Sequence, residues 1–176
     1  MHQRMRQFEL LEPSTVAEAL DLLQVEGRRS MVLAGGVDLV SKMRRWQVQV
    51  DTLVSIRRIA GLDVLSVGSD GWLEIGPLVT LRQLERFAPA RDSWSILHAA
   101  TSQIASVQVK TMGTVIGNLC VATPASDVAV ALYSLGAQLR LVGPGSERTV
   151  PIEEFFVPVA SSVLRRDEIV TRLLVP

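Results

Sequence analysis

Residues 32–39 read VLAGGVDL, and residues 113–118 read GTVIGN. We call these the first and the second glycine segment. Glycine has no Cβ, so the main chain can adopt a positive φ and present its N–H groups to a bulky, acceptor-rich ligand such as a diphosphate. Glycines between apolar runs are also typical of simple turns. The composition therefore leaves two interpretations open, an anion-binding loop or a plain turn.

The residues around the first glycine segment predict a strand, a loop and a helix in that order. Residues 31–34 (MVLA) are typical of a short buried strand, and the spacing of Leu39, Val40 and Met43 predicts a helix over residues 37–44. A helix that begins directly after such a loop directs free N–H groups and the positive end of its dipole at the loop's ligand. This order favours the anion-binding interpretation.

The rest of the N-terminal third completes a small α/β unit. Thr15 and Glu18 have the spacing of a capping box, in which both side chains satisfy free amides at a helix start. Gly27 stands where a left-handed helix end is expected. Residues 52–56 (TLVSI) predict a second strand.

The remainder of the chain predicts a larger mixture of strands and helices. Thr80 is expected to cap a helix that Pro89 ends. The other expected elements are a strand over 72–76, a helix over 93–104, a helix that ends at Gly136, a hairpin around 143–146 and a last strand over 167–175. We therefore expect an α+β protein with two subdomains, residues 1–57 and 58–176.

Pro124 and Asp127 follow the second glycine segment and mark the first turn of the helix that ends at Gly136. Asp127 has two interpretations. It can complement the helix dipole, or it can accept hydrogen bonds from ribose or ribityl hydroxyls, as acidic residues do in other dinucleotide sites. Spacing alone favours the first, because acids are common in first turns.

Composition excludes several classes of function. Lys+Arg and Asp+Glu number 18 each over 176 residues, so no net field attracts nucleic acid or an anionic membrane. The start lacks the apolar core of a signal peptide, and no apolar run is long enough to span a bilayer, so we expect a cytoplasmic protein. Cys120 is the single cysteine, which excludes an internal disulfide and an iron–sulfur cluster held by this chain alone. Redox chemistry would require a bound organic cofactor.

The two histidines give no catalytic pair. His98 lies in an expected helix without a carboxylate or nucleophile at a telling spacing, and His2 lies at the terminus. We assign no catalytic residue and expect no metal ion bound by this chain.

Taken in order, these segments resemble a known family. Residues 32–39, 73–76, 80–81, 113–119 and the PASD of 124–127 are similar to the FAD-binding domain of molybdenum hydroxylases. This is the flavoprotein, or medium, subunit of the carbon monoxide dehydrogenase and xanthine dehydrogenase family. The resemblance covers nearly the whole chain. It implies the two-subdomain α+β fold shared with vanillyl-alcohol oxidase, with FAD between the subdomains and the C-terminal flavoprotein domain absent.

The resemblance also implies which residues bind FAD. The backbone of the first glycine segment would line one side of the flavin diphosphate, through Val32, Leu33, Ala34, Gly35, Gly36, Val37, Asp38 and Leu39. The second would hold the opposite side and the ribityl chain, through Thr114, Val115, Ile116, Gly117 and Asn118. Asp127 would bind FAD hydroxyls or ring-edge polar groups.

The implied function is electron transfer. A molybdopterin-binding large subunit oxidises a substrate, a small subunit with two [2Fe–2S] clusters passes electrons on, and this subunit delivers them through FAD to an external acceptor. Because family members continue with a further domain, we expect an apolar face that docks a partner subunit or a second copy of the chain. Two alternatives are a flavin-free docking subunit and a free-standing flavin reductase. The last ranks lowest, because no proton donor is evident.

Three positions depart from the family pattern. Ile116 replaces the first glycine of Thr-x-Gly-Gly-Asn. A branched side chain resists a positive φ, and would cost about 1 to 3 kcal/mol if that geometry were required. Lys110 and Thr111 replace Arg-Asn, without the planar fork of donors, and Val37 replaces a hydrogen-bonding side chain. The sequence therefore predicts weakened FAD binding, which Ile116→Gly would tighten.

Overall fold

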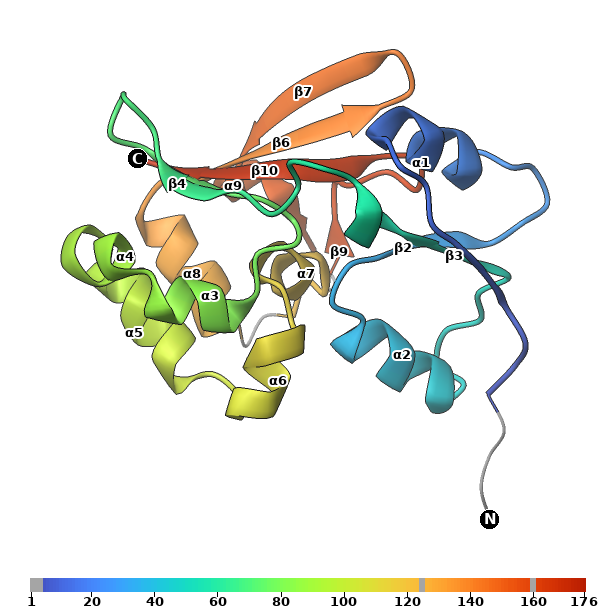
Figure 1. Ribbon diagram of the computed structural model, residues 1–176, viewed down its shortest axis with the longest axis horizontal. Helices are drawn as coiled ribbons and strands as arrows, with labels where there is room; N and C mark the ends of the chain where they lie inside the picture. The colour runs from blue at the N-terminus through green and yellow to red at the C-terminus, as the bar shows by residue number, and fades with distance from the viewer. Residues whose placement is uncertain (1–4, 124–125, 159–160) are drawn as a thin grey trace.

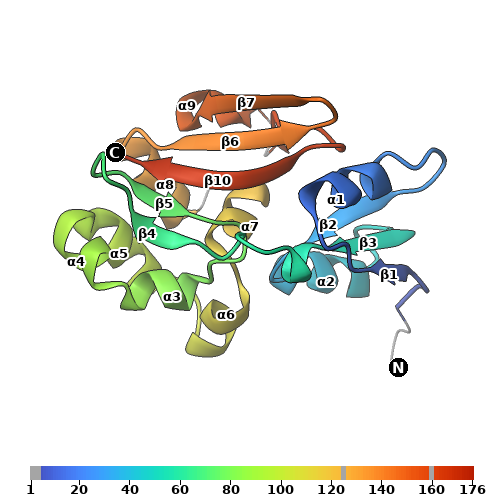
Figure 2. The ribbon, with the colours of Figure 1, turned by 45° about the horizontal axis from the view of Figure 1, so that its top comes forward.

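The computed structural model describes residues 5–123, 126–158 and 161–176 of the chain. Two main β-sheets dominate the fold, and helices pack against each of them (Figure 1). Figure 2 shows the smaller sheet beside the larger one, with α7 near their junction. The mixed arrangement of helices and strands agrees with the α+β class expected from the sequence.

The smaller sheet has the strand order β1-β3-β2, with all strands parallel. The strands are β1 (Glu9–Leu11), β2 (Ser30–Leu33) and β3 (Thr52–Ser55), and the helices are α1 (Val16–Leu23) and α2 (Val37–Arg44). Successive side chains of a strand point to opposite faces. Leu53 accordingly packs with Met43 of α2, and Val54 packs with Leu20 of α1. The two helices therefore cover opposite faces of this sheet.

Only the Thr15 half of the predicted capping box of α1 forms. The Thr15 hydroxyl accepts a hydrogen bond from the Glu18 N–H at 3.1 Å. The Glu18 carboxylate accepts from the N–H of Ser14 at 2.7 Å, one residue before the cap. Gly27 has a φ of 74°, but it lies in the turn beyond the helix end at Leu23.

The larger sheet is antiparallel, with the order β4-β5-β10-β6-β7. Its strands are β4 (Leu65–Val67), β5 (Leu73–Ile75), β6 (Gln138–Gly143), β7 (Ser146–Pro151) and β10 (Ile169–Val175). One face carries apolar side chains such as Leu139 and Leu173, which belong to the largest core cluster. Between strands, Arg140 pairs with Glu147 at 3.3 Å. The expected hairpin and last strand are thus confirmed.

Helices from the middle of the chain pack on the apolar face of this sheet (Figure 1). They are α3 (Leu81–Arg86), α4 (Ala88–Ser93), α5 (Ser95–Gln103), α7 (Val115–Cys120), α8 (Asp127–Ser134) and α9 (Ile152–Phe155). A further helix, α6 (Val107–Met112), packs on α3, away from the sheet. A single turn of 3₁₀-helix, η1 (Ile56–Arg58), follows β3, and β8 (Phe156–Val157) pairs with β9 (Ser161–Ser162). Thr80 caps α3 as predicted, through a capping box with Gln83.

The prediction for Pro89 is wrong. Pro89 lies in the first turn of α4, where the missing N–H of a proline costs no helical hydrogen bond, and α3 ends earlier, at Arg86. Gly136 does follow α8, with a φ of 67°. The described helices include none that is both long and apolar enough to cross a membrane.

The two sheets are joined by a shared apolar cluster. Leu20 of α1 and Val54 of β3 pack together with Ile59 and Leu62, which follow η1, and with Ile169 of β10. Packing of this kind fixes the relative position of the elements that meet in it. The smaller sheet therefore has a defined orientation against the larger one, and the two glycine segments meet beside this junction.

Candidate functional site

The first glycine segment forms the strand, loop and helix predicted from the sequence. β2 ends at Leu33 and α2 begins at Val37, with Gly36 between them in the left-handed conformation (φ 77°, ψ −1°). A Cβ at Gly36 would lie 2.9 Å from Leu33 Cδ1. The positive φ favours glycine at this position, whereas the end of the Leu33 side chain could move aside for a Cβ.

Five successive backbone N–H groups of this segment lack a protein acceptor. Within residues 5–123, 126–158 and 161–176, no oxygen accepts from the N–H of Gly35, Gly36, Val37, Asp38 or Leu39. The first hydrogen bond of α2 runs from the Val40 N–H to the Gly36 carbonyl at 2.9 Å. Unpaired N–H groups at a helix N-terminus form an anion site, and a left-handed glycine makes the backbone concave there.

The side chain of Asp38 does not oppose an anion with a free charge. Its carboxylate pairs with the Lys42 ammonium one turn along α2, at 2.8 Å. Both side chains are partly exposed. The donors of this segment are therefore backbone groups, and a neighbouring cation compensates the one acidic side chain among them.

The two glycine segments are in direct contact. A Cβ at Gly35 would overlap the carbonyl oxygen of Met112, and would lie 3.2 Å from the Gly113 Cα. A Cβ at Gly113 would in turn lie 3.7 Å from the Val37 Cγ2. Gly35 is therefore required by the approach of the second segment's backbone, a reason that the sequence did not indicate.

The backbone before α7 is hydrogen-bonded to the segment that leads into α3. The N–H of Leu81 donates to the carbonyl of Gly113 at 2.9 Å, and the N–H of Val115 donates to the carbonyl of Val79 at 3.0 Å. These bonds flank a bridge between Thr80 and Thr114. The second glycine segment is thus held on a rigid support.

The second glycine segment is a helix start, and its interpretation as a loop is wrong. Thr114 caps α7, and its hydroxyl accepts from the Gly117 N–H at 3.0 Å. The Asn118 N–H donates to the Thr114 carbonyl at 2.9 Å. A Cβ at Gly117 would lie 2.6 Å from the Thr114 hydroxyl. Most of this segment's donors are therefore already used within the protein, and its glycine serves the cap.

The expected strain at Ile116 is absent. Ile116 lies in the first turn of α7, and the described non-glycine residues with positive φ are Trp46, Ala105 and Ala122. Ile116 is 3% exposed and packs in the core cluster between the larger sheet and its helices. A branched side chain therefore fits this position, because the backbone is helical and the side chain points into the core.

Asp127 begins α8, next to the end of the second glycine segment. The N-cap residue Ser126 donates through its hydroxyl to the Asn118 Oδ1 at 2.7 Å and accepts from the Ala129 N–H at 3.2 Å. Asp127 itself is exposed. Its contact with FAD stays a prediction. Pro124, predicted in the first turn, lies outside the described residues.

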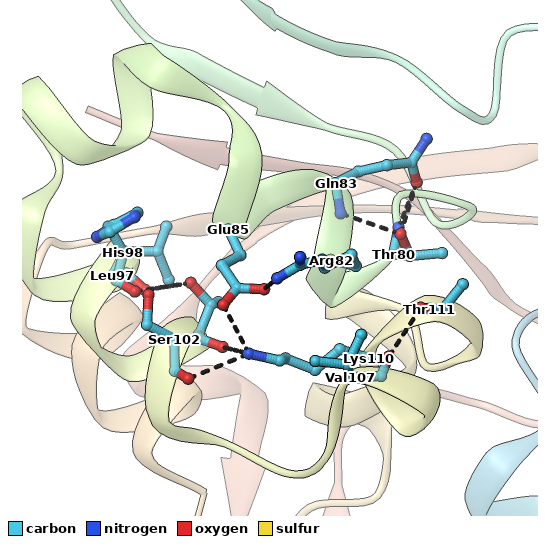
Figure 3. A network of polar contacts seen from close by, with 11 residues as sticks. Thr80, Arg82, Gln83, Glu85, Leu97, His98, Ser102, Val107, Lys110 and Thr111 are labelled. Carbon is cyan, nitrogen blue, oxygen red and sulfur yellow. Dashed lines mark hydrogen bonds and ion pairs between the residues drawn. The ribbon is translucent and has the colours of Figure 1, made fainter.

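Lys110 is a buried cation in α6, the helix that directly precedes the second glycine segment (Figure 3). Its ammonium group donates to Glu85 at 2.7 Å and to the Ser102 carbonyl at 3.1 Å. The Lys110 hydrogen bond, the largest cause, and a second bond from Arg82 hold the pKa of Glu85 below its usual value of 4.5. Lys110 thus ties α6 to α3 and α5, and its charge is used there.

Arg57 is a site residue that the sequence analysis missed. Its Nε donates to the Ala34 carbonyl at 2.8 Å and its Nη2 to the Gly35 carbonyl at 3.1 Å. It is the second residue after β3, in η1. The sequence did carry a signal for it. Neighbouring parallel strands end at the same edge of a sheet, so a cation soon after β3 lies close to the loop that follows β2.

The arrangement suits the binding of a dinucleotide diphosphate. No group of three or more His, Cys, Asp and Glu side chains lies together in the described parts of the chain. The unpaired amides of the first segment match the acceptor oxygens of a diphosphate, with no side-chain charge needed at the contact.

Comparison with known proteins agrees with this geometry. The FAD-subunit of nicotinate dehydrogenase from Eubacterium barkeri is 31% identical over 176 residues, which cover 97% of this chain and 59% of the relative. The medium chain of carbon monoxide dehydrogenase from Hydrogenophaga pseudoflava is 30% identical over 170 residues, or 96% of this chain and 58% of the relative.

The fold comparison gives the same result. A solved structure of the Hydrogenophaga pseudoflava carbon monoxide dehydrogenase, which lacks the Mo-pyranopterin moiety of its cofactor, matches with a TM-score of 0.93 and 28% identity. The match covers 98% of this chain and 60% of that chain. The chain thus spans about three fifths of the length of these relatives.

Fold and comparisons together define the class: an α+β domain that binds a flavin nucleotide. The chain belongs to the family described as the FAD binding domain in molybdopterin dehydrogenase, whose model matches residues 6–176. FAD is accordingly the cofactor of this domain. The resemblance on which the sequence analysis relied is confirmed.

Proposed function

We propose that this chain is the FAD-binding part of a molybdenum hydroxylase flavoprotein subunit, in which electrons pass from [2Fe–2S] clusters of a partner through FAD to an external acceptor. The observation that carries the proposal is the row of unpaired N–H groups from Gly35 to Leu39, at the point where the two glycine segments touch. A diphosphate satisfies such donors without a counter-charge from side chains.

In this proposal the residues of the chain bind and orient the cofactor. The backbone of residues 32–39 holds one side of the diphosphate. Residues 114–118 hold the opposite side of the diphosphate. The N–H groups of Thr114 and Ile116 have no acceptor among the described residues and are available for it. Asp127 accepts from FAD hydroxyls or from ring-edge groups. When bound, FAD supplies the redox chemistry, accepting and releasing electrons.

The proposal includes two partner subunits, a molybdopterin-binding large subunit and a [2Fe–2S] small subunit. Relatives named as medium chains, and as a subunit of a dehydrogenase complex, support this. The two subdomains, residues 1–57 and 58–176, would hold FAD between them. The strain that argued for a flavin-free docking subunit is removed, because Ile116 is helical and buried.

Titration of the purified chain with FAD, followed by flavin fluorescence and visible absorption, tests the proposal. We expect saturation near one FAD per chain, and no binding of riboflavin at the same concentrations, because riboflavin has no diphosphate. Iron and molybdenum that co-purify with a tagged chain from its own host would test the partners. A colourless chain that takes up no FAD would overturn the proposed function.

A further inference from the structure

The carbonyl groups of the first glycine segment are held from behind by one side chain. Arg57 Nε donates to the Ala34 carbonyl at 2.8 Å, and Arg57 Nη2 donates to the Gly35 carbonyl at 3.1 Å. The two acceptors are successive residues, separated from Arg57 by 23 and 22 positions. One planar guanidinium therefore grips two neighbouring peptide groups, which a lysine ammonium cannot do with the same geometry.

Each of these carbonyls determines the direction of an amide. In a trans peptide the carbonyl of one residue and the N–H of the next point to opposite sides, and the described residues contain no cis peptide. Gripping the Ala34 carbonyl therefore fixes the N–H of Gly35, and gripping the Gly35 carbonyl fixes the N–H of Gly36. These are the first two of the five unpaired donors.

One of the two peptide groups that Arg57 holds joins Gly35 to Gly36, which is the most flexible part of the segment. A glycine pair has many accessible backbone conformations, so the peptide between Gly35 and Gly36 can rotate at little steric cost when nothing holds it. We propose that Arg57 is a positioning residue that holds the Gly35 and Gly36 amides toward the diphosphate. This inference rests on the proposed function, since it assigns Arg57 a role in the same site.

The neighbouring Arg58 provides a matched control. It lies in the same turn of η1, carries the same charge, and pairs with Glu12 at 3.5 Å. Its side chain is 69% exposed. Substituting Arg58 removes the same charge as substituting Arg57. It leaves the hydrogen bonds to the carbonyls of the first glycine segment intact.

The experiment compares Arg57→Gln, Arg57→Lys and Arg58→Gln with the parent chain. Dissociation constants are measured for FAD, and for ADP and adenosine as probes with and without a diphosphate. We expect Arg57→Gln to weaken FAD and ADP about tenfold and adenosine less than twofold, because only the diphosphate uses the oriented amides. Arg57→Lys should recover part of the loss, and Arg58→Gln should bind FAD like the parent chain.

A second measurement tests the positioning directly, without ligand. In ¹H–¹⁵N correlation spectra of the apo protein, the Gly35 and Gly36 amides should shift or broaden in Arg57→Gln and stay in place in Arg58→Gln. Equal FAD affinities of these two variants, or equal losses for ADP and adenosine, would overturn the role of Arg57. Failure of the parent chain to bind FAD is a separate result, and it would overturn the proposed function itself.

Discussion

Both glycine segments carry glycines next to apolar residues, but they use these glycines differently. In the first, Gly36 takes a positive φ, Gly35 lets another backbone approach, and the N–H groups that follow are unpaired. In the second, Gly117 makes room for the Thr114 hydroxyl, which already occupies its N–H. Glycine between apolar residues therefore indicates close approach, and only the hydrogen bonds of the folded chain show whether donors remain for a ligand.

The comparison assigns the two segments different tasks. The first offers five unpaired donors. The second offers two, and hydrogen bonds to Val79 and Leu81 and the buried Lys110 hold it in place. A substitution in the first segment should change ligand affinity most. A substitution in the second should change the stability of the fold most.

The largest effect is expected from Gly35→Ala. The new Cβ would meet backbone atoms of Met112, which cannot move without displacing α6, so the two segments must separate. We expect FAD affinity to fall by about a hundredfold or more, measured by flavin fluorescence. Gly27→Ala is the control, because it introduces a strained positive φ in open space. FAD binding by Gly35→Ala at parental affinity would refute the contact between the segments.

The next effect is expected from Ile116→Gly. The substitution removes a buried side chain and places a poor helix former in α7, at a cost of about 3 to 5 kcal/mol in the free energy of unfolding. Urea denaturation measures this cost. Val130→Gly in α8, where the side chain is 62% exposed, should cost only about 0.5 kcal/mol. Tighter FAD binding without loss of stability would restore the view that Ile116 obstructs the cofactor.

A smaller loss of stability is expected from Lys110→Met. The variant removes the buried Lys110 ammonium from the Glu85 carboxylate, whose side chain is 16% exposed, and leaves Arg82 as its remaining cation. An unpaired buried charge costs about 3 kcal/mol or more, and the Arg82 pair that remains lowers the expected cost to about 2 kcal/mol. Lys42→Met, at the exposed pair with Asp38, should cost less than about 1 kcal/mol. Equal thermal denaturation of the two variants would show that the buried pair does not support the second segment.

The same pair predicts a response to acid. Because the folded-state pKa of Glu85 lies below its usual 4.5, its contribution to stability is complete above pH 4.5 and is lost as the pH falls through the lowered pKa. Glu85→Gln should therefore flatten the acid side of a plot of unfolding free energy against pH. Glu26→Gln, at an exposed position, should leave that slope unchanged. Identical slopes for both variants would contradict the assignment.

The smallest effect is expected from Gly117→Ala. The Cβ would displace the Thr114 hydroxyl and weaken the cap of α7, at about 1 kcal/mol, partly offset by the better helix propensity of alanine. Thr114→Ala removes the same cap, so the two losses should not add in the double variant. Additive losses, measured by urea denaturation, would show that Gly117 has a role apart from the cap.

The sequence predicted the elements that local patterns determine. α2 has the predicted bounds, and the Thr15 and Thr80 caps, the hairpin and the last strand were all indicated by spacing or by turn residues. The family resemblance predicted that the cofactor is FAD and that the two glycine segments bind it. Local patterns and resemblance together therefore gave the fold class and the location of the candidate site.

The remaining features depend on contacts between distant parts of the chain. Spacing cannot show that Met112 approaches Gly35, that Arg57 grips Ala34, or that Lys110 turns toward Glu85. The error at Ile116 has the same origin. A branched residue at a glycine position suggests strain, but here the backbone is helical and the side chain is buried in a core that only the folded structure shows.

A crystal structure of the chain saturated with FAD tests the central claim most directly. We predict diphosphate oxygens within hydrogen-bond distance of backbone nitrogens in residues 35–39, with the Gly117 N–H still bonded to Thr114 and the Arg57 guanidinium still on the carbonyls of Ala34 and Gly35. A diphosphate bound away from residues 35–39, with their N–H groups left unpaired, would contradict the account.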